Sequence, residues 1–292
     1  MSGGFADTGP DAGTGAGASA GVPVDEGGGD GAFYVPLGGE RFSASELTQG
    51  PWSLEQQHGG PPSALLAGRM ERLAPRPELV PARITVEFLG PVPVGEVRVG
   101  VRVVRDGRSV QLVAGELSVD GRVCLSAQLW RVRAAKVPGL PAGALAPAAV
   151  PAGVPAEPQG PLARRFGYGR ALDWRFVSGS FRYPGPAVAW VRCPRALVAG
   201  EEPRPLERVV LVADTGSGIG AELDSRRFVW PNLDLSIHLL RTPVAEWLCL
   251  DSAMELGDAG VGVARTRLFD EAGLFGSVAQ SLFVAPVPGA ED

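Results

Sequence analysis

The chain has 292 residues, of which 45% are hydrophobic and 20% charged, and its formal net charge is −5. This composition is typical of a globular protein with ample material for a core. The charge comes from the first 31 residues, which hold five acids and no Lys or Arg, so the other residues carry 27 basic and 27 acidic side chains. Such a balance argues against nucleic-acid and membrane-surface partners.

Cysteine and histidine usage argues against a metal site and against a secreted disulfide scaffold. The three cysteines have no C-x-x-C spacing, and the chain has only two histidines. No apolar run reaches the roughly 18 residues of a transmembrane helix. The N-terminus lacks the basic and apolar regions of a signal peptide. We therefore expect a cytoplasmic enzyme that needs no metal and no cofactor.

Two low-complexity segments divide the chain. Residues 1–31 are rich in glycine and almost free of large apolar side chains, which predicts a disordered N-terminal tail. Residues 137–162 hold seven prolines and one charge, a composition that favours an extended linker. The remaining parts, 32–136 and 163–286, are predicted to be two folded units. Residues 287–292 form a short C-terminal tail.

In the first unit, the pattern predicts one helix and then an antiparallel meander. Residues 58–75 have two prolines suited to a first turn and an apolar stripe at helical spacing. Asp106-Gly107 and Asp120-Gly121 are hairpin signals between apolar runs. The predicted strands are 82–90, 97–105, 109–119 and 122–133.

The second unit repeats this order after two additional strands. A helix is predicted over 205–218, where an apolar run follows a proline. A helix followed by a meander, twice over, predicts an α+β fold in which a sheet curls around a central helix in each unit. The predicted strands are 172–182, 187–193, 232–241, 246–256, 261–270 and 274–285.

Two similar segments of the sequence indicate a domain duplication. Residues 121–130 (GRVCLSAQLW) and 273–283 (GLFGSVAQSLF) each start with a turn glycine that follows acidic residues. Each then places an Ala-Gln pair in an apolar run, and the two copies lie 152 residues apart. A period this long indicates a duplicated domain, because solenoid repeats have periods of about 20–50 residues.

The motifs HGGPPSALL, VEFLGPVPVGEVRV, VRDGRSVQL, NLDLSIHLLR and VAQSLFV occur in this order. Together with the duplication, they resemble the double hot-dog acyl-CoA thioesterases of the bacterial thioesterase II type, over about residues 32–286. The resemblance implies two tandem hot-dog units with their sheets paired edge to edge. It also implies hydrolysis of acyl-CoA thioesters without a covalent enzyme intermediate.

The resemblance further implies that an Asp, a Thr or Ser, and a Gln orient and activate one water. The matching positions are Asp214, Asn232 and Gln280. Asn232 departs from the family pattern. Since an amide does not accept a proton as readily as a carboxylate, this departure gives Asp214 more weight as the base.

The residues themselves allow other interpretations of these positions. Asp214 ends an apolar run and could be a base or a helix-end residue. Gln280 lies in an apolar strand and needs hydrogen-bond partners if buried, although a strand glutamine such as Gln128 often faces solvent. Asn232 could end a turn. For Asp234 we expect a solvent-facing strand position.

The sequence His58-Gly59-Gly60 stands where the first helix is predicted to begin. Free amides at a helix start can hold a thioester carbonyl or an oxyanion, and glycines permit close approach. We therefore predict that these three residues bind substrate, although a tight packed turn is the structural alternative. His238, in a leucine-rich strand, is expected to be structural.

The predicted function is hydrolysis of acyl-CoA, or of acyl groups on a carrier protein, with the acyl chain in an apolar tunnel between the units. A homo-oligomer is expected. One rival is a hot-dog enoyl-thioester hydratase or dehydratase, which would need an acid paired with His58, and none stands at an obvious spacing. The other rival is a non-catalytic acyl-thioester binding protein. Because only the second unit has both an Asp at its helix end and an Asn at its strand start, we predict one site per chain.

Overall fold

The protein was analysed as a computed structural model that describes residues 31–136, 138, 164–244 and 246–287. The predicted N-terminal tail (1–31), linker (137–162) and C-terminal tail (287–292) lie outside the described residues, apart from residues 31, 138 and 287. All the helices and strands reported below fall in the two units expected on either side of the linker.

The first unit contains the predicted helix and meander. The helix is α1 (Gly60–Arg72), and the meander is β3 (Leu79–Phe88), β4 (Glu96–Asp106), β5 (Val110–Val119) and β6 (Arg122–Arg133). Asp120 and Gly121 both have positive φ, as the predicted Asp-Gly hairpin turn requires. Sequence analysis missed the elements that precede the helix, namely β1 (Tyr34–Gly38), β2 (Arg41–Ala44) and the short helix η1 (Glu46–Thr48).

The second unit keeps the predicted order, but it has short additional elements and its predicted helix is interrupted. Its elements are α3 (Gly167–Ala171), β7 (Asp173–Ser178), β8 (Ala187–Arg192), α4 (Pro205–Ala213), α5 (Gly216–Ile219), β9 (Phe228–Val229), β10 (Asp234–Leu239), β11 (Leu248–Leu256), β12 (Val261–Asp270), β13 (Gly273–Phe283) and β14 (Ala285–Pro286). The prediction of one continuous helix over 205–218 was wrong. The chain makes a tight turn at Asp214 and Thr215, and the Thr215 amide donates to the Val212 carbonyl.

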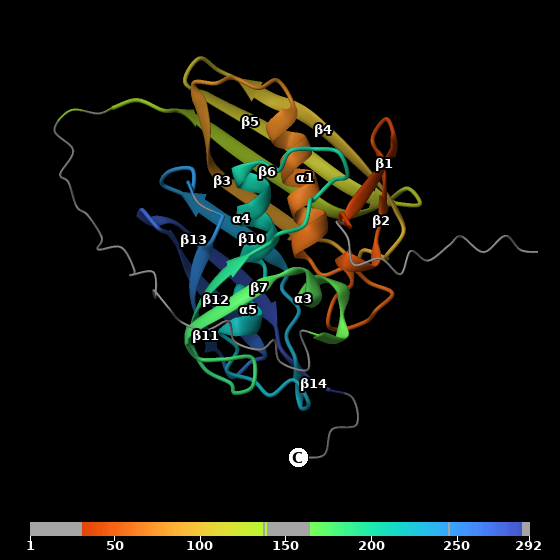
Figure 1. The fold of residues 1–292 in the computed structure, drawn as a ribbon, viewed down its shortest axis with the longest axis vertical. Helices are drawn as coiled ribbons and strands as arrows, with labels where there is room; N and C mark the ends of the chain where they lie inside the picture. Colours follow the sequence, from red (N-terminus) through yellow and green to blue (C-terminus); the bar gives the residue numbers. More distant parts are fainter. Residues whose placement is uncertain (1–30, 137, 139–163, 245, 288–292) are drawn as a thin grey trace, which may run out of the picture.

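Twelve of the strands form one continuous antiparallel sheet in the order β1-β2-β4-β5-β6-β3-β10-β13-β12-β11-β8-β7. The two units join at β3 and β10, where Thr85 is the register partner of Ser236. Figure 1 shows α1 and α4 side by side at the centre of the molecule, with the sheet around them. The edge-to-edge pairing of the units therefore brings both helices to one shared interior.

The helices are antiparallel and pack closely. A Cβ on Gly68 of α1 would meet the Glu207 carboxylate of α4, so the small residue sets the helix spacing. Within the described residues, α1 also lies against β4, β5 and β6, whereas the short helix α5 lies against β11 and β12. No helix in the described part of the chain is long and apolar enough to cross a membrane.

The two similar sequence segments are offset by one residue in the structural repeat. Thr85 pairs with Gln128 on β6, while Ser236, which stands 151 residues after Thr85, pairs with Ala279 on β13. The structural counterpart of Gln128 is therefore Ala279, one residue before Gln280. Because strand side chains alternate between faces, this shift of one residue places the two glutamines on opposite faces of the sheet. Gln128 is exposed and Gln280 is fully buried.

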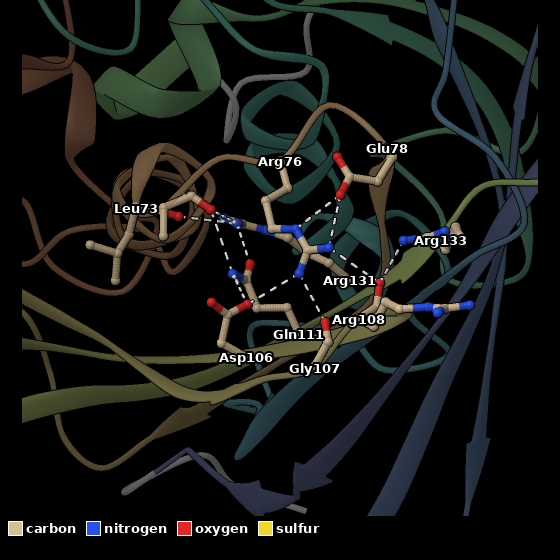
Figure 2. A network of polar contacts seen from close by, with 10 residues as sticks. Leu73, Arg76, Glu78, Asp106, Gly107, Arg108, Gln111, Arg131 and Arg133 are labelled. Carbon is tan, nitrogen blue, oxygen red and sulfur yellow. Dashed lines mark hydrogen bonds and ion pairs between the residues drawn. The ribbon is translucent and has the colours of Figure 1, made fainter.

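A buried arginine closes the C-terminal end of α1. Arg131 on β6 donates to the carbonyls of Met70 and Leu73 and, at 2.7 Å, to the side-chain oxygen of Gln111 on β5. Figure 2 shows Arg131 and Gln111 meeting the end of the helix, with Arg76 in the same network. Burial lowers the pKa of Arg131. The last carbonyls of α1, which have no partner within the helix, are thereby satisfied.

Replacing Arg131 by Met is expected to lower the free energy of unfolding by about 2–4 kcal/mol, because buried carbonyls lose a charged donor. Urea denaturation measures this cost. Arg133→Met is the matched control on the same strand, since Arg133 is exposed and its loss should change stability by less than about 0.5 kcal/mol. Equal losses in the two variants would contradict the proposed role of Arg131.

Candidate active site

Asp214 is a buried carboxylate where the two units meet. It follows the last residue of α4 and is 5% exposed. A Cβ on Gly59, just before α1, would lie 2.8 Å from Asp214 Oδ2. The carboxylate therefore lies at the C-terminal end of α4 and beside the N-terminal end of α1, where the helix dipole favours negative charge.

The two predicted amide partners converge on one oxygen of this carboxylate. Asn232 Nδ2 donates to Asp214 Oδ1 at 2.9 Å, and Gln280 Nε2 approaches the same atom at 3.4 Å. Gln280 Oε1 accepts a hydrogen bond from the Ser217 amide at 3.2 Å, which fixes the orientation of the glutamine. The structure thus brings Asp214, Asn232 and Gln280 together from three elements of the second unit.

His58 approaches the other oxygen from the first unit. Its Nδ1 lies 3.0 Å from Asp214 Oδ2, so the acid that the sequence spacing did not reveal is Asp214. The imidazole stacks on the Tyr168 ring with 3.9 Å between centroids. The amide of His58 donates to the Thr48 carbonyl at 2.7 Å, which anchors the backbone. The Asp214 carboxylate is therefore bracketed by groups from both units.

Glycine is required at positions 59 and 60, because there is no room for a side chain. A Cβ on Gly60 would lie 2.4 Å from the Leu211 carbonyl oxygen of α4. Because Pro61 and Pro62 have no N–H and the Gly60 amide donates to His58 Nδ1, the Gly59 amide is the donor left at the very start of α1 among the described residues. The start of the helix therefore lies against the end of α4, beside Asp214.

Tyr168 holds the site residues in place, a role that the sequence did not predict. Its hydroxyl donates to the Leu211 carbonyl at 2.7 Å and accepts from the Thr215 hydroxyl at 2.7 Å. Burial raises the pKa of Tyr168 well above its usual value, so it remains a neutral phenol. Tyr168 lies two residues after Phe166 in the arginine-rich segment 161–170, and the sequence of this segment gave no signal for the role. Tyr168 fixes both the His58 ring and the turn that carries Asp214.

The related position in the first unit has no comparable site. Counted from the first residue of each helix, Arg69 of α1 corresponds to Asp214, and it forms an ion pair with Glu201. The structural counterpart of Gln280 is Leu129, which is buried in the core. These differences agree with the expectation of one site per chain.

The remaining predicted positions lie outside this cluster. Gln128 and His238 are exposed. Asp234 was expected to face solvent, but it is partly buried: its carboxylate accepts from the Ser281 amide and the Ser236 hydroxyl, each at 2.8 Å. Asp234 therefore links β10 to β13, two residues after Asn232.

A pair of tryptophans lies next to the site. Trp230 is buried, and its indole N–H donates to the carbonyl of Ser217, whose own amide binds Gln280. Trp52, in the loop before α1, meets Trp230 edge to face at 5.6 Å and is 51% exposed. The loop is fixed by hydrogen bonds from Gln57 to the carbonyls of Val92 and Pro93, which lie in the connection between β3 and β4. The exposed indole of Trp52 is thus linked to the carboxylate by successive contacts through Trp230, Ser217 and Gln280.

Solved structures share the fold. A hot-dog fold protein of unknown function from Alicyclobacillus acidocaldarius is 17% identical over 86% of this chain and 96% of its own, with a TM-score of 0.68. An acyl-CoA thioesterase II, TesB2, from Mycobacterium marinum is 19% identical over 89% and 97% of the two chains, with a TM-score of 0.63. These likenesses show a hot-dog fold with a large antiparallel sheet.

Family comparison covers both units. The model for the acyl-CoA thioesterase N-terminal domain matches residues 48–132, and the model for the C-terminal domain matches residues 146–284. No protein with a curated description matches the chain significantly. Because the two domain models match in order and together span most of the sequence, the chain belongs to the acyl-CoA thioesterase family.

Proposed function

We propose that the protein hydrolyses acyl-CoA thioesters at the carboxylate of Asp214, by direct attack of water and without a covalent intermediate. The observation that carries this mechanism is the convergence of Asn232, Gln280 and His58 on one buried carboxylate. Asp214 would accept the proton of the attacking water. Asn232 and Gln280 hold the carboxylate through Oδ1, which leaves Oδ2 directed to the start of α1.

The turn His58-Gly59-Gly60 would bind the thioester. The His58 amide donates to the Thr48 carbonyl and the Gly60 amide to His58 Nδ1. The Gly59 amide, at the positive end of α1 and next to Asp214 Oδ2, is the donor that a ligand could use. A donor there would stabilise the oxyanion that forms when water attacks the carbonyl carbon. Asn232 stands where the family pattern has Thr or Ser. This difference is compatible with hydrolysis, because the Asn232 amide orients the base and does not itself need to accept a proton.

The proposed architecture is a double hot-dog with units at 32–136 and 163–286, each with its own central helix. The support is the order of elements, since α1 follows β2 and precedes a meander, and α4 does the same after β8. We further propose a cytoplasmic protein that forms a homo-oligomer and also accepts acyl groups on a carrier protein. The balanced charge of residues 32–292 favours neither nucleic acid nor a membrane surface as a partner.

Release of free thiol from a panel of acyl-CoA substrates tests the function. Chain lengths from acetyl to palmitoyl, and one acyl-carrier protein, would be compared with purified wild-type protein. Thiol release well above the uncatalysed rate on at least one acyl-CoA is the expected result. No release from any member of the panel would contradict the proposal.

One observation favours a second candidate activity, the hydration of enoyl thioesters. The His58–Asp214 contact at 3.0 Å supplies the acid-base pair that this chemistry needs. Hydration adds water to the β-carbon and a proton to the α-carbon, and it leaves the thioester bond intact. Loss of enoyl-CoA absorbance without thiol release would assign this activity; thiol release with no loss of the double bond would exclude it.

Trp52 is expected to contact the acyl chain. The reacting carbonyl must lie at Asp214, and the half-exposed indole offers apolar surface close by. Burying part of a tryptophan contributes about 1–2 kcal/mol. Trp52→Ala should therefore lower kcat/KM for long-chain substrates by roughly tenfold and leave acetyl-CoA almost unaffected.

The matched control is Val104→Ala, which removes another exposed apolar side chain, on β4 near Asp106. It should change neither long-chain nor short-chain kinetics. An equal effect of Trp52→Ala on all chain lengths would contradict the assignment of the acyl chain to this surface.

A further inference from the structure

His58 Nδ1 has two neighbours that one protonation state cannot satisfy. It lies 3.0 Å from Asp214 Oδ2, and it accepts a hydrogen bond from the Gly60 amide at 3.1 Å. With a bare Nδ1, the imidazole accepts from Gly60 but faces a carboxylate oxygen. With a proton on Nδ1, it donates to Asp214 but faces an N–H. Each state suits one neighbour only. Of the two contacts, the one from the Gly60 amide has hydrogen-bond geometry at Nδ1, whereas Asp214 Oδ2 is close to the ring without a hydrogen bond to it.

The Gly60 contact selects the tautomer in the resting site. Because the amide N–H can only donate, it favours a bare Nδ1 and a proton on Nε2. Among the described residues, Nε2 has no hydrogen-bond partner, and the side chain is 13% exposed. Stacking on Tyr168 fixes the plane of the ring. His58 thus presents an N–H donor whose opposite nitrogen adjoins the proposed base.

We infer that His58 is the general acid that protonates the departing thiolate. This inference rests on the proposed hydrolysis. Water attacks the carbonyl carbon and gives one proton to Asp214 Oδ2. When the tetrahedral intermediate collapses, the C–S bond breaks and its electron pair leaves on sulfur. The sulfur takes the Nε2 proton, and Asp214 returns its proton to Nδ1.

The proton balance closes over one turnover. The thiol carries the former Nε2 proton, and the proton taken from water ends on Nδ1 by way of Asp214. The water oxygen ends in the carboxylic acid, and Asp214 is again a carboxylate. His58 has changed from the Nε2–H to the Nδ1–H tautomer, in which it donates to Asp214. Exchange with solvent and the Gly60 amide restore the first tautomer. No oxidant, reductant or second substrate is required.

Leaving-group dependence separates this role from a structural one. An alkyl thiolate such as CoA needs a proton to leave efficiently, whereas a thiophenolate of low basicity does not. His58→Ala should therefore lower kcat for acyl-CoA by about 100-fold and lower kcat for the corresponding acyl thiophenyl ester by less than about threefold. A variant that merely disturbs the site would lose the same factor on both substrates, and that result would overturn the inference.

Two further variants complete the experiment. His238→Ala, at the other histidine, is the matched control; that side chain is exposed on β10, and both substrates should react at the wild-type rate. Asp214→Asn should be impaired on both substrates, because each needs the base. Full activity of Asp214→Asn would contradict the proposed hydrolysis itself, whereas equal losses in His58→Ala contradict only the role of His58.

Discussion

Asp214→Asn is expected to lower thiol release from acyl-CoA by about 10²–10⁴-fold, the range for loss of a positioned acid or base. Asparagine has the shape of aspartate, and its oxygen can still accept from Asn232, so packing at the end of α4 should survive. An amide nitrogen cannot take the proton of the attacking water. The loss should therefore appear in kcat, with KM little changed.

Asp234→Asn is the matched control, because this carboxylate lies on the neighbouring strand and binds Ser281 and Ser236. It should retain activity within a few-fold of wild type and lose some stability. Thiol release is measured for both variants with the best substrate of the panel. Retention of more than about a tenth of wild-type kcat in Asp214→Asn would show that another group is the base.

Gly60→Ala is expected to disrupt the site strongly. The added Cβ would lie 2.4 Å from the Leu211 carbonyl oxygen, and a backbone atom cannot rotate away. The start of α1 must then move from the end of α4. We expect a loss of about 1–3 kcal/mol in the free energy of unfolding. Because a displacement of about 1 Å can cost 10²-fold, kcat should fall by a similar factor.

Gly218→Ala provides the comparison, since a Cβ there would meet nothing within 4 Å and the residue lies in the helix α5. It should be neutral or slightly stabilising, because alanine favours helix. Thermal or urea unfolding and thiol release are measured on both variants. A Gly60→Ala protein with wild-type stability and activity would show that the two helices need no such close contact.

Much of the fold could be predicted because its signals are local. The prolines and apolar stripe placed α1, and Asp120-Gly121 placed the β5–β6 turn. The hairpin of β1 and β2 was missed, although Gly38 and Gly39 both have positive φ there. Its strands are short and β1 is mostly exposed, so they show little of the alternation that identifies a half-buried strand.

The residues of the second unit around Asp214 could be predicted, but their partner from the first unit could not. Asp214, Asn232 and Gln280 were identified through motif order. The contact of Asp214 with His58 depends on the packing of α1 against α4, which no spacing along the chain encodes. The sequence therefore suggested substrate binding for His58 but not a proton-sharing contact with the base.

The sequence similarity around Gln128 and Gln280 suggested equivalent positions for a related reason, although the two residues are not structurally equivalent. Each last strand contains a bulge after its turn, at Cys124 in β6 and at Phe275 in β13. Counted from these bulges, the two glutamines differ by one position. Residues that match in the sequence thus face opposite sides of the sheet, in line with the prediction of one site per chain.

We expect one thioester site, formed by Asp214 together with the start of α1. A crystal structure of the Asp214→Asn variant with intact acyl-CoA would locate this site. One ligand per chain is expected, with the thioester carbonyl oxygen within hydrogen-bond distance of the Gly59 amide. A thioester bound beside Arg69 and Glu201, or bound at both positions, would contradict it.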